Sequence, residues 1–497
     1  MLHRPLTLSI IVALSATTAL AQDVPQSGSE YFTNAQSLLA ERVAYQPNTN
    51  SARNVILFVA DGMGVGTNYG IRLFMGQQEG QLGEEYNLPY DTFPHTALIK
   101  TYNINAQTPD SAPTAGAMNT GVKQIFNTIN LDETAVYDDC SSEVPLALFA
   151  ELASEAGRSV GVVSTASVTH ATPAAVYART ANRNWFHDAP EGCDDIATQL
   201  VNQFEAGVID VALGGGVRDF APEGTELETG TGRRLDGQNL FERLDGLGVQ
   251  YVYDAETLAA ADRNEPIIGL FANSDMAYQF DRPDTQPSLQ DLTVAAIERL
   301  QTNEEGFYLM VEAGRVDHAN HAGNAHRTFT DGVAFAEAVQ AALDLVDLED
   351  TLVIVTADHE HVISFNGYCG RGTPITGLCM GISNDQVEHT GEPELADDGL
   401  PFPVVGFLNG PGSVLIEQED GTYSGSRPEL TQEEAQDPDY LQQALVPMSS
   451  ETHSGVDVAL WANGPWAHLF GGTLDQEMIF HVMQHAVLGS ESETQSE

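Results

Sequence analysis

The chain has 497 residues and a formal net charge of −51, and 42% of its residues are hydrophobic. This hydrophobic content is too high for a disordered acidic chain, and the charge argues against nucleic-acid binding and against binding to anionic lipid. The sequence contains two lysines, Lys100 and Lys123. An acidic, lysine-poor folded surface suggests adaptation to salt, because screening relieves its self-repulsion.

The first residues predict a signal peptide over residues 1–21. Arg4 supplies the positive charge, Leu6–Ala16 the apolar stretch and Ala19–Ala21 the small-residue cleavage site. The apolar stretch is too short to span a bilayer comfortably, and the acidic segment 489–497 lacks a hydrophobic anchor signal. We therefore expect a periplasmic or secreted protein with no membrane anchor.

Four cysteines fit export to an oxidising compartment. They permit three pairings. We favour Cys140 with Cys193 and Cys369 with Cys379, the second pair because its members are close in sequence. A zinc-binding cysteine set is not expected, because none of the four has C-x₂-C spacing.

Short apolar strands alternate with helices along much of the chain. Glu30–Val43 has the spacing of an amphipathic helix and precedes a buried strand over Asn54–Ala60. The alternation predicts an α/β fold with a mostly parallel central sheet flanked by helices on both faces. Further strands are predicted over Ser159–Ser164, Val208–Leu213, Phe307–Val311 and Thr351–Thr356, and helices over Pro145–Glu155, Leu289–Leu300 and Thr328–Leu345.

Two regions interrupt this alternation. Phe220–Asp236 is polar and glycine-rich, which predicts an irregular loop on the core. Gly367–Met448 is richer in glycine, proline and acid, with strand-like pieces such as Ser413–Glu417, so we expect an inserted subdomain there. The expected organisation is a helical arm at 22–50, a catalytic core at 51–366 and 449–488, the insert at 367–448 and an acidic tail at 489–497.

Three predicted strands deliver acidic residues at their carboxyl ends, namely Asp61, Glu312 and Asp358. In parallel sheets, ligands bind beyond these strand ends. Three carboxylates that converge there need cations to offset their repulsion. The sequence therefore predicts a metal site at this edge of the sheet.

A run of small residues, Thr108–Gly121, surrounds Ser111. Ser111 is expected to cap a helix, and Pro113 is tolerated in a first turn. The free N–H groups and the dipole of such a helix favour an anion at its start. An ordinary N-cap serine is the alternative interpretation of this run.

Histidines accompany the acidic residues. Asp317 and His321 are spaced i, i+4, so they share a helix face and can hold one cation. Asp358 and His359 follow a buried strand, where a solvated polar turn is the alternative. His453 lies in a loop before a strand predicted over Val456–Ala462, and it can complete a ligand set.

Together these motifs resemble those of the alkaline phosphatase family, over nearly all of the mature chain and in order. The Asp-Ser-Ala, Thr-Ala-Asp-His and Val-Asp-x-x-x-His segments are family signatures. The resemblance is closest to the animal-type branch. It implies hydrolysis of small phosphate monoesters, a homodimer and a crown-like insert. The segments that carry the animal-type resemblance are Ala171–Ala175, Ala181–Trp185, Arg234–Asn239 and Thr452–Gly455.

The resemblance also implies two Zn²⁺ ions and one Mg²⁺ ion, and a role for each candidate residue. Ser111 is the nucleophile and also a metal ligand, and Arg183 binds phosphate. Two further histidines, His170 and His318, lie beside the magnesium. The implied ligands are Asp317, His321 and His453 for the first zinc, Asp61, Asp358, His359 and Ser111 for the second, and Asp61, Thr172 and Glu312 for magnesium.

The implied mechanism passes through a phosphoserine at Ser111, which water then hydrolyses. The sequence departs from the family at Gly116, where many relatives have Thr, and at Ala272 and Gln286, which replace two acidic ligands of the animal enzymes' calcium site. Pro113 and Gly116 leave open how the helix presents Ser111.

Two alternatives remain. A phosphodiesterase or sulfatase of the same superfamily is one, although Ala115 replaces the arginine that the sulfatase pattern requires. A non-catalytic phosphate- or zinc-binding protein is the other, and it could dispense with Ser111. Turnover of a phosphate monoester, with and without a chelator, distinguishes them.

Overall fold

The structure is a computed structural model, and it describes residues 24–489. The expected signal peptide lies outside the described residues, as does the tail from residue 490 on. The chain divides into two units after Gln46. In the first unit, the expected amphipathic helix is α1 (Glu30–Ala44), and its apolar residues Tyr31, Leu38, Leu39 and Val43 are exposed.

The second unit is built around a ten-stranded sheet. The apolar runs predicted as strands form its middle, and every residue of β1, β9 and β10 is buried. The ten strands are β1 (Asn54–Val59), β2 (His95–Lys100), β3 (Ser159–Ser167), β4 (Val211–Gly215), β7 (Gln250–Val252), β8 (Ile267–Leu270), β9 (Phe307–Glu312), β10 (Thr351–Thr356), β18 (Val458–Asn463) and β19 (Gly472–Asp475).

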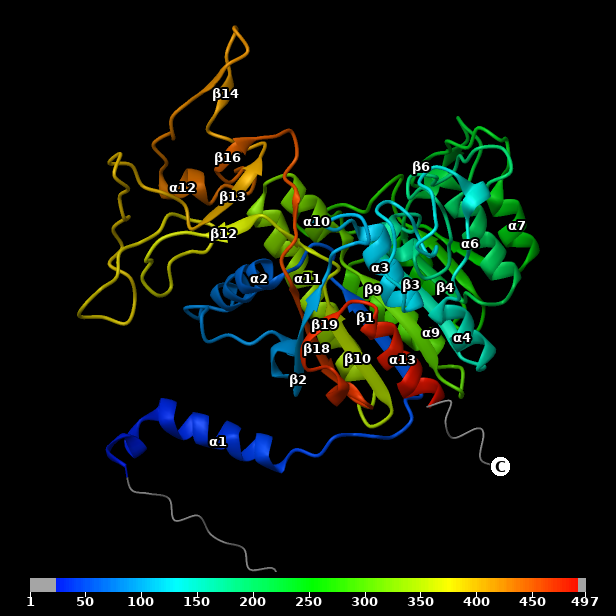
Figure 1. Cartoon of the computed structure of the whole chain (residues 1–497), viewed down its shortest axis with the longest axis horizontal. Coiled ribbons are helices and arrows are strands. Elements are labelled where there is room, and N and C mark those ends of the chain that lie inside the picture. The colour runs from blue at the N-terminus through cyan, green and yellow to red at the C-terminus, as the bar shows by residue number, and fades with distance from the viewer. Residues whose placement is uncertain (1–23, 490–497) are drawn as a thin grey trace, which may run out of the picture. The chain divides into compact units, whose positions relative to one another are not determined.

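The strand order is β19-β2-β18-β10-β1-β9-β3-β4-β8-β7. Neighbouring strands run parallel from β10 to β7, and β18 runs antiparallel to both β10 and β2. This order places β10, β1, β9 and β3 side by side (Figure 1). Because these four strands are parallel, their carboxyl ends meet at one edge.

Helices flank the sheet on both faces, as predicted. One group contains α2, α9 and α11, and another contains α3, α4 and α13, with contacts inside each group. The helices of the second unit are α2 (Val65–Gln78), α3 (Ser111–Thr120), α4 (Phe149–Glu155), α5 (Ala171–Ala174), α6 (Ile196–Glu205), α7 (Leu240–Gly246), α8 (Ala255–Ala260), α9 (Leu289–Leu300), α10 (Gly314–His321), α11 (Ala325–Leu345), α12 (Gln432–Ala435) and α13 (Met478–Leu488).

Short strands lie outside the main sheet. Most of residues 220–236 is irregular, as expected, apart from a two-residue pairing of β5 with β6. Residues 367–448 hold α12 and several of these strands, which Figure 1 shows grouped beyond the sheet. The short strands are β5 (Glu226–Leu227), β6 (Gly230–Thr231), β11 (Glu360–His361), β12 (Ile363–Phe365), β13 (Val405–Gly410), β14 (Ile416–Glu417), β15 (Tyr423–Ser424), β16 (Ala444–Pro447) and β17 (His453–Ser454).

Some predicted bounds were wrong. The helix expected from Pro145 begins at Phe149, because Glu151 caps the backbone N–H of Leu148. The strand expected from Val208 begins at Val211, since residues 206–210 close the turn after α6. The strand-like piece 413–417 is reduced to the two residues of β14.

Two disulfides and a lysine cluster brace the fold. The favoured pairs Cys140–Cys193 and Cys369–Cys379 are both bonded. Both lysines meet Asp475, at 2.6 Å from Lys100 and 3.7 Å from Lys123. Among residues 24–489, no helix has the length and hydropathy needed to span a bilayer.

Candidate active site

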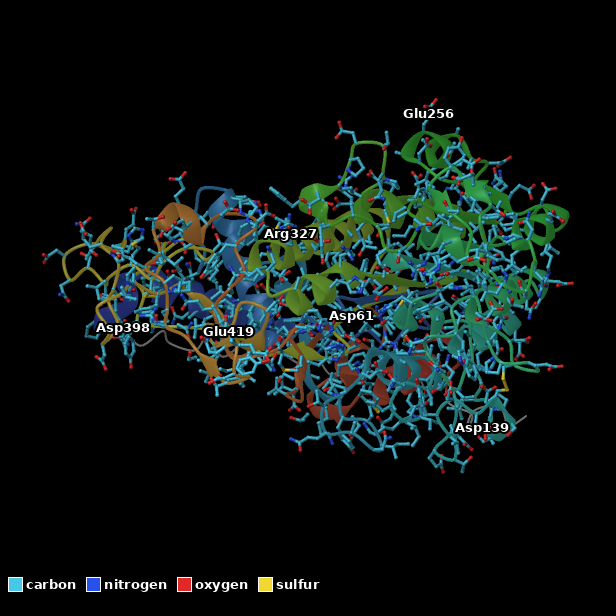
Figure 2. The ribbon with its side chains drawn as sticks, turned by 90° about the horizontal axis from the view of Figure 1, so that it is seen from above. Asp61, Asp139, Glu256, Arg327, Asp398 and Glu419 are labelled. Atoms are coloured by element: carbon cyan, nitrogen blue, oxygen red, sulfur yellow. A yellow bond between two sulfur atoms is a disulfide. The ribbon has the colours of Figure 1, made fainter. Side chains whose placement is uncertain are left out.

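The three strand-end acids converge as predicted. In the sheet, Val59 pairs with Glu312 on one side and with Thr356 on the other. Asp61 and Asp358 each follow two residues after these paired ends, and all three carboxylates are fully buried. Figure 2 shows Asp61 inside the molecule, while exposed acids such as Asp139 and Asp398 lie at its periphery.

Three groups of acids and histidines form at this edge. In each group, one ligand atom per residue lies within 4.8 Å of the others. Asp61 belongs to two groups, so the groups adjoin. The groups are Asp317, His321, His361 and His453; Asp61, Asp358 and His359; and Asp61, His170 and Glu312.

The first group surrounds the carboxylate of Asp317, on α10. His321 Nε2 and His453 Nε2 each lie 3.4 Å from Asp317 Oδ1, and they are 3.0 Å from each other. The Nδ1 atoms of these two histidines face backbone carbonyls, that of Glu451 at 2.6 Å and that of Pro109 at 2.9 Å. Because a carbonyl only accepts, each Nδ1 carries the proton and each Nε2 is free to bind a metal.

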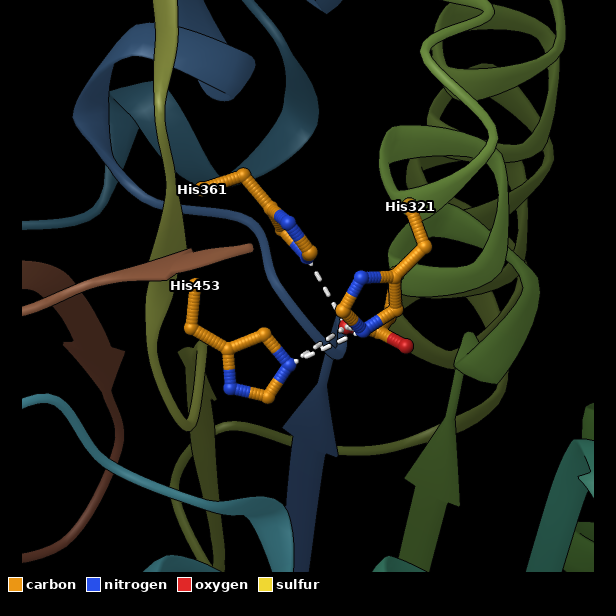
Figure 3. Close-up of side chains that lie close together, drawn as sticks. His321, His361 and His453 are labelled. Carbon is orange, nitrogen blue, oxygen red and sulfur yellow. Dashed lines mark hydrogen bonds and ion pairs between the residues drawn. The ribbon is translucent and has the colours of Figure 1, made fainter. Parts of the chain in front are cut away.

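His361 is a member of this group to which the sequence interpretation gave no role. Pairing of β11 with β17 sets it directly opposite His453, and Figure 3 shows the rings of His321, His361 and His453 turned toward one place. Alternation along the chain could have revealed it, because His359 and His361 are two residues apart. Its Nε2 donates to Asp317 Oδ1 at 2.8 Å.

The second group meets Ser111. His359 Nε2 lies 3.3 Å from Asp61 Oδ1, 3.4 Å from Asp358 Oδ2 and 3.2 Å from Ser111 Oγ. The predicted helix is α3, but its N-cap is Asp110, whose carboxylate accepts from the N–H of Ala112. Ser111 is instead the first helical residue, which leaves its hydroxyl free of capping and turned to the metal group.

The two unusual residues of α3 do not interrupt it. All ten residues from Ser111 to Thr120 are helical and buried. Pro113 lies in the first turn, where its missing N–H costs nothing. Gly116 leaves space for the side chain of Gln124, since a Cβ there would lie 2.3 Å from Gln124 Oε1.

The third group lies between β1, β9 and the start of α5. Thr172 Oγ1 is 3.5 Å from Asp61 Oδ2, and Ser164 donates to Glu312. His170 is nearer than expected, since one of its nitrogens falls within the group. The ring of His318 packs against His170 at 5.5 Å between centroids, but His318 is outside the group.

The buried carboxylates of these groups lie close together, and bound cations would offset their repulsion. Burial and the neighbouring carboxylates raise the pKa of Asp61 well above its usual range, and raise that of Glu312 to about 8. Asp61 Oδ1 and Glu312 Oε1 are buried without a hydrogen-bond partner among the described residues. Unpaired buried carboxylate oxygens are costly, so these residues fit bound cations.

Arg183 stands beside Ser111. Its guanidinium is ion-paired with Asp110 and donates to His170 Nε2 at 3.0 Å. Two anchors fix the plane of the fork, which suits recognition of two phosphate oxygens. Asp110 is therefore a second residue without a predicted role, although it precedes Ser111 in the sequence.

Gln286, one of the two residues expected to replace acidic calcium ligands, bonds protein groups. The amide of Gln286 accepts from the N–H of Ala277 at 3.0 Å and donates to the carbonyl of Phe271 at 2.9 Å. Arg282 donates to the backbone carbonyl of Gln286. A guanidinium and an amide thus hold this loop together.

The strand ends of the sheet hold adjoining groups of acids and histidines, and a serine hydroxyl and an anchored arginine lie beside them. This arrangement defines a metal-dependent hydrolase of phosphate compounds. The family model for alkaline phosphatase matches residues 52–488. The chain belongs to the alkaline phosphatase family and is a metal-dependent phosphomonoesterase.

Animal relatives match almost end to end. The tissue-nonspecific alkaline phosphatase isozyme of Gallus gallus is 38% identical, over 96% of this chain and 93% of that protein. The alkaline phosphatase of Gadus morhua is 39% identical, over 91% and 95%. The alkaline phosphatase structure from Thermus thermophilus shares the fold, with a TM-score of 0.63 and 24% identity over 89% of this chain and 93% of that one.

Proposed function

We propose that the site holds two Zn²⁺ ions and one Mg²⁺ ion and hydrolyses phosphate monoesters through a phosphoserine at Ser111. The first zinc set is Asp317, His321 and His453. The second is Asp61, Asp358, His359 and the oxygen of Ser111. Asp61, Thr172 and Glu312 hold magnesium, with His170 and His318 beside it.

The donor atoms support this assignment. Two histidine nitrogens and a carboxylate suit zinc, and a set made only of oxygens suits magnesium. His170 Nε2 already accepts from Arg183, which keeps His170 outside the magnesium set. When bound, the zinc ions would activate the nucleophile and stabilise the attacking and leaving oxygens of an in-line displacement.

The chain's own groups orient the reactants. The first turn of α3 presents Ser111 Oγ to the phosphorus, and the dipole of the helix favours the phosphate anion. Arg183 donates to two phosphate oxygens and offsets their charge. Ser111 Oγ gives up its proton and forms the new bond to phosphorus as the bond to the alcohol oxygen breaks, and that oxygen takes up a proton from water. Water then attacks the phosphoserine, releasing inorganic phosphate and restoring Ser111.

The position of Ser111 Oγ, 3.2 Å from His359 Nε2, carries this proposal. The test is p-nitrophenyl phosphate turnover by wild type, by Ser111→Ala and by chelated enzyme, with intact mass after acid quench. We expect wild type to gain one phosphoryl group, and turnover to collapse in the other two arms. Near wild-type turnover by Ser111→Ala would exclude the covalent step, and full turnover after complete metal removal would exclude the metal sets.

We also propose a homodimer. Two apolar surfaces support it. One is formed by the exposed apolar residues of α1, and the other is a patch within residues 408–448, where β13 pairs with β16. This patch comprises Leu408, Leu445, Val446 and Met448, with exposed fractions between 43% and 59%. Large exposed apolar surfaces mark interaction sites. A monomer by small-angle scattering at molar salt would contradict the dimer.

Export and salt adaptation complete the proposal. The predicted signal peptide and the oxidised cysteines support a periplasmic or secreted location. Edman sequencing of protein from the native host is expected to begin after Ala21. An N-terminus at Met1 on the active protein would contradict export by this route.

A further inference from the structure

Glu451 is a buried carboxylate that touches two histidines of the first metal group. Its side chain is fully buried. Glu451 Oε2 accepts from His361 Nδ1 at 2.5 Å, and Oε1 accepts from the N–H of Val362 at 2.6 Å. Its backbone carbonyl accepts from His321 Nδ1 at 2.6 Å, and its N–H donates to the carbonyl of His321 at 2.9 Å.

We propose that Glu451 is a positioning residue for the first metal site, acting on it through His361. The inference rests on the proposed zinc set Asp317, His321 and His453. Glu451 fixes the ring of His361, and His361 in turn fixes the carboxylate of Asp317. The main chain of Glu451 fixes the tautomer of His321. One residue thus orders two of the three ligands and lies two residues before the third.

The bonding of His361 makes it a support for the ligands and not a ligand itself. Its Nδ1 donates to Glu451 and its Nε2 donates to Asp317, and both partners are carboxylates that only accept. Neither ring nitrogen keeps a free lone pair for a metal. The third histidine of the group therefore orients Asp317.

A carboxylate behind a histidine is the usual outer partner of a metal ligand, and its removal typically weakens metal binding. Here the hydrogen-bonded series has one more member, because the carboxylate of Glu451 bonds the imidazole of His361, which bonds the ligand carboxylate of Asp317. Loss of the Glu451 side chain leaves His361 Nδ1 without an acceptor and frees its ring to turn. Asp317 then loses the bond that fixes Oδ1, while the main-chain bond to His321 persists.

The test compares Glu451→Ala with wild type by competition for zinc against a chromophoric chelator, using full-length protein stripped of metal. We expect the affinity of the first site to fall about 10- to 100-fold and the second site to be unchanged. Cobalt(II) substitution gives an independent readout, since its visible absorption changes when Asp317 reorients. Glu451→Gln should recover most of the affinity, because its amide can bond both Val362 and His361.

Glu360→Ala is the matched control. Glu360 is also buried, and its carboxylate accepts from the N–H of Gly66 and the hydroxyl of Thr67, both at 2.9 Å, on α2. It also accepts from the backbone N–H of His361 at 3.2 Å, but among the described residues no hydrogen bond joins it to the imidazole of His361, which is what Glu451 holds. Glu360→Ala should keep the wild-type zinc affinity. If Glu451→Ala does not fold, His361→Ala applies the same test from the other end of the bond.

The outcomes separate the two proposals. Wild type that binds no zinc refutes the proposed function. Wild type that binds two zincs, with unchanged affinity and cobalt spectrum in Glu451→Ala or its His361→Ala substitute, overturns the role of Glu451 alone. In a variant that combines Glu451→Ala with His361→Ala, a loss of zinc affinity smaller than the sum of the two single losses would support action through His361.

Discussion

Arg183 and Asp110 form a part-buried ion pair that joins this arginine to the N-cap of the helix that begins at Ser111. The same carboxylate accepts from the N–H groups of Ala112 and Asn127. The arginine and the serine are thus held against one anchor. Their spacing depends on Asp110 and not on the flexible stem of Arg183.

Arg183→Lys should weaken phosphate recognition. Lysine keeps the charge but loses the planar fork that bonds Asp110 and His170 together with phosphate. Charge-assisted hydrogen bonds contribute about 1.5–3 kcal/mol each, so kcat/KM for p-nitrophenyl phosphate should fall about 10- to 100-fold, chiefly through KM. Steady-state kinetics and the inhibition constant of inorganic phosphate measure this.

Arg179→Lys is the control for that substitution. Arg179 is also part-buried and pairs with a carboxylate, that of Glu151 at 2.5 Å. Among the described residues, Arg179 bonds Glu151, Leu146 and Gln199, and none of these belongs to the three metal groups. Equal losses in the two variants would show a general effect of replacing arginine.

Asp331→Asn should stabilise the protein at alkaline pH. Burial raises the pKa of Asp331 from its usual 3.8 to about 7, and it accepts only one described backbone bond, from Gln279 at 3.1 Å. The folded state therefore binds the proton more tightly than the unfolded state. Stability falls as pH rises from about 4 to 7, and the cost stays at higher pH, at up to about 4 kcal/mol.

Denaturant unfolding at pH 5 and pH 9 tests the sign of that effect. The gain from Asp331→Asn should be larger at pH 9, since the wild-type carboxylate is then charged. Asp245→Asn, on the exposed surface of α7, should show no such difference. A gain confined to pH 5 would contradict the raised pKa of Asp331.

Gly116→Ala should destabilise α3. The new Cβ would lie 2.3 Å from Gln124 Oε1, which accepts from the N–H of Asn130 at 2.6 Å. Forcing that amide aside should cost about 1–3 kcal/mol, as other overpacked cores do. The fall in melting temperature should be much smaller in a Gln124→Ala background, where the clash is gone.

Gly246→Ala is the matched control for Gly116→Ala. No heavy atom lies within 4 Å of a Cβ built at Gly246, at the end of α7. Its melting temperature should equal or exceed that of wild type. An equal loss at both glycines would remove the steric explanation.

Stability should rise with salt. At a net charge of −51, exposed carboxylates repel one another over a Debye length of about 30 Å at 0.01 M salt, but only about 3 Å at 1 M. The melting temperature should therefore be higher in molar sodium chloride than in dilute buffer, and potassium chloride should act alike. Equal melting temperatures in dilute and molar salt would count against salt adaptation.

The sequence predicted the sheet because its central strands are apolar throughout, a pattern that burial on both faces imposes. It also predicted the meeting of Asp61, Glu312 and Asp358, since parallel strands share one carboxyl edge. Strand and helix ends were less certain, because local capping, such as that by Glu151 at Leu148, sets them.

Residues that act through long-range pairing were harder to foresee. His361 joins the first group only because β11 pairs with β17, ninety-two positions further along the chain (453 minus 361). Asp110 displaced Ser111 as the helix cap, and a single sequence does not say which of two adjacent capping residues is used. The contacts of Glu451 with His361 and His321 depend on the fold, so the sequence alone did not indicate a role for Glu451.

Both lysines contact Asp475, which limits covalent coupling of the protein to resins and dyes through lysine amines. Lys123 has a side chain only 16% exposed, against 40% for Lys100. The hydrogen bond that Lys100 donates to Asp475 raises the pKa of Lys100, which keeps its amine protonated and slow to react. Amine-directed resins and dyes would therefore couple poorly to the lysine side chains. Carbodiimide chemistry at the many exposed carboxylates is the practical route to immobilising this phosphatase.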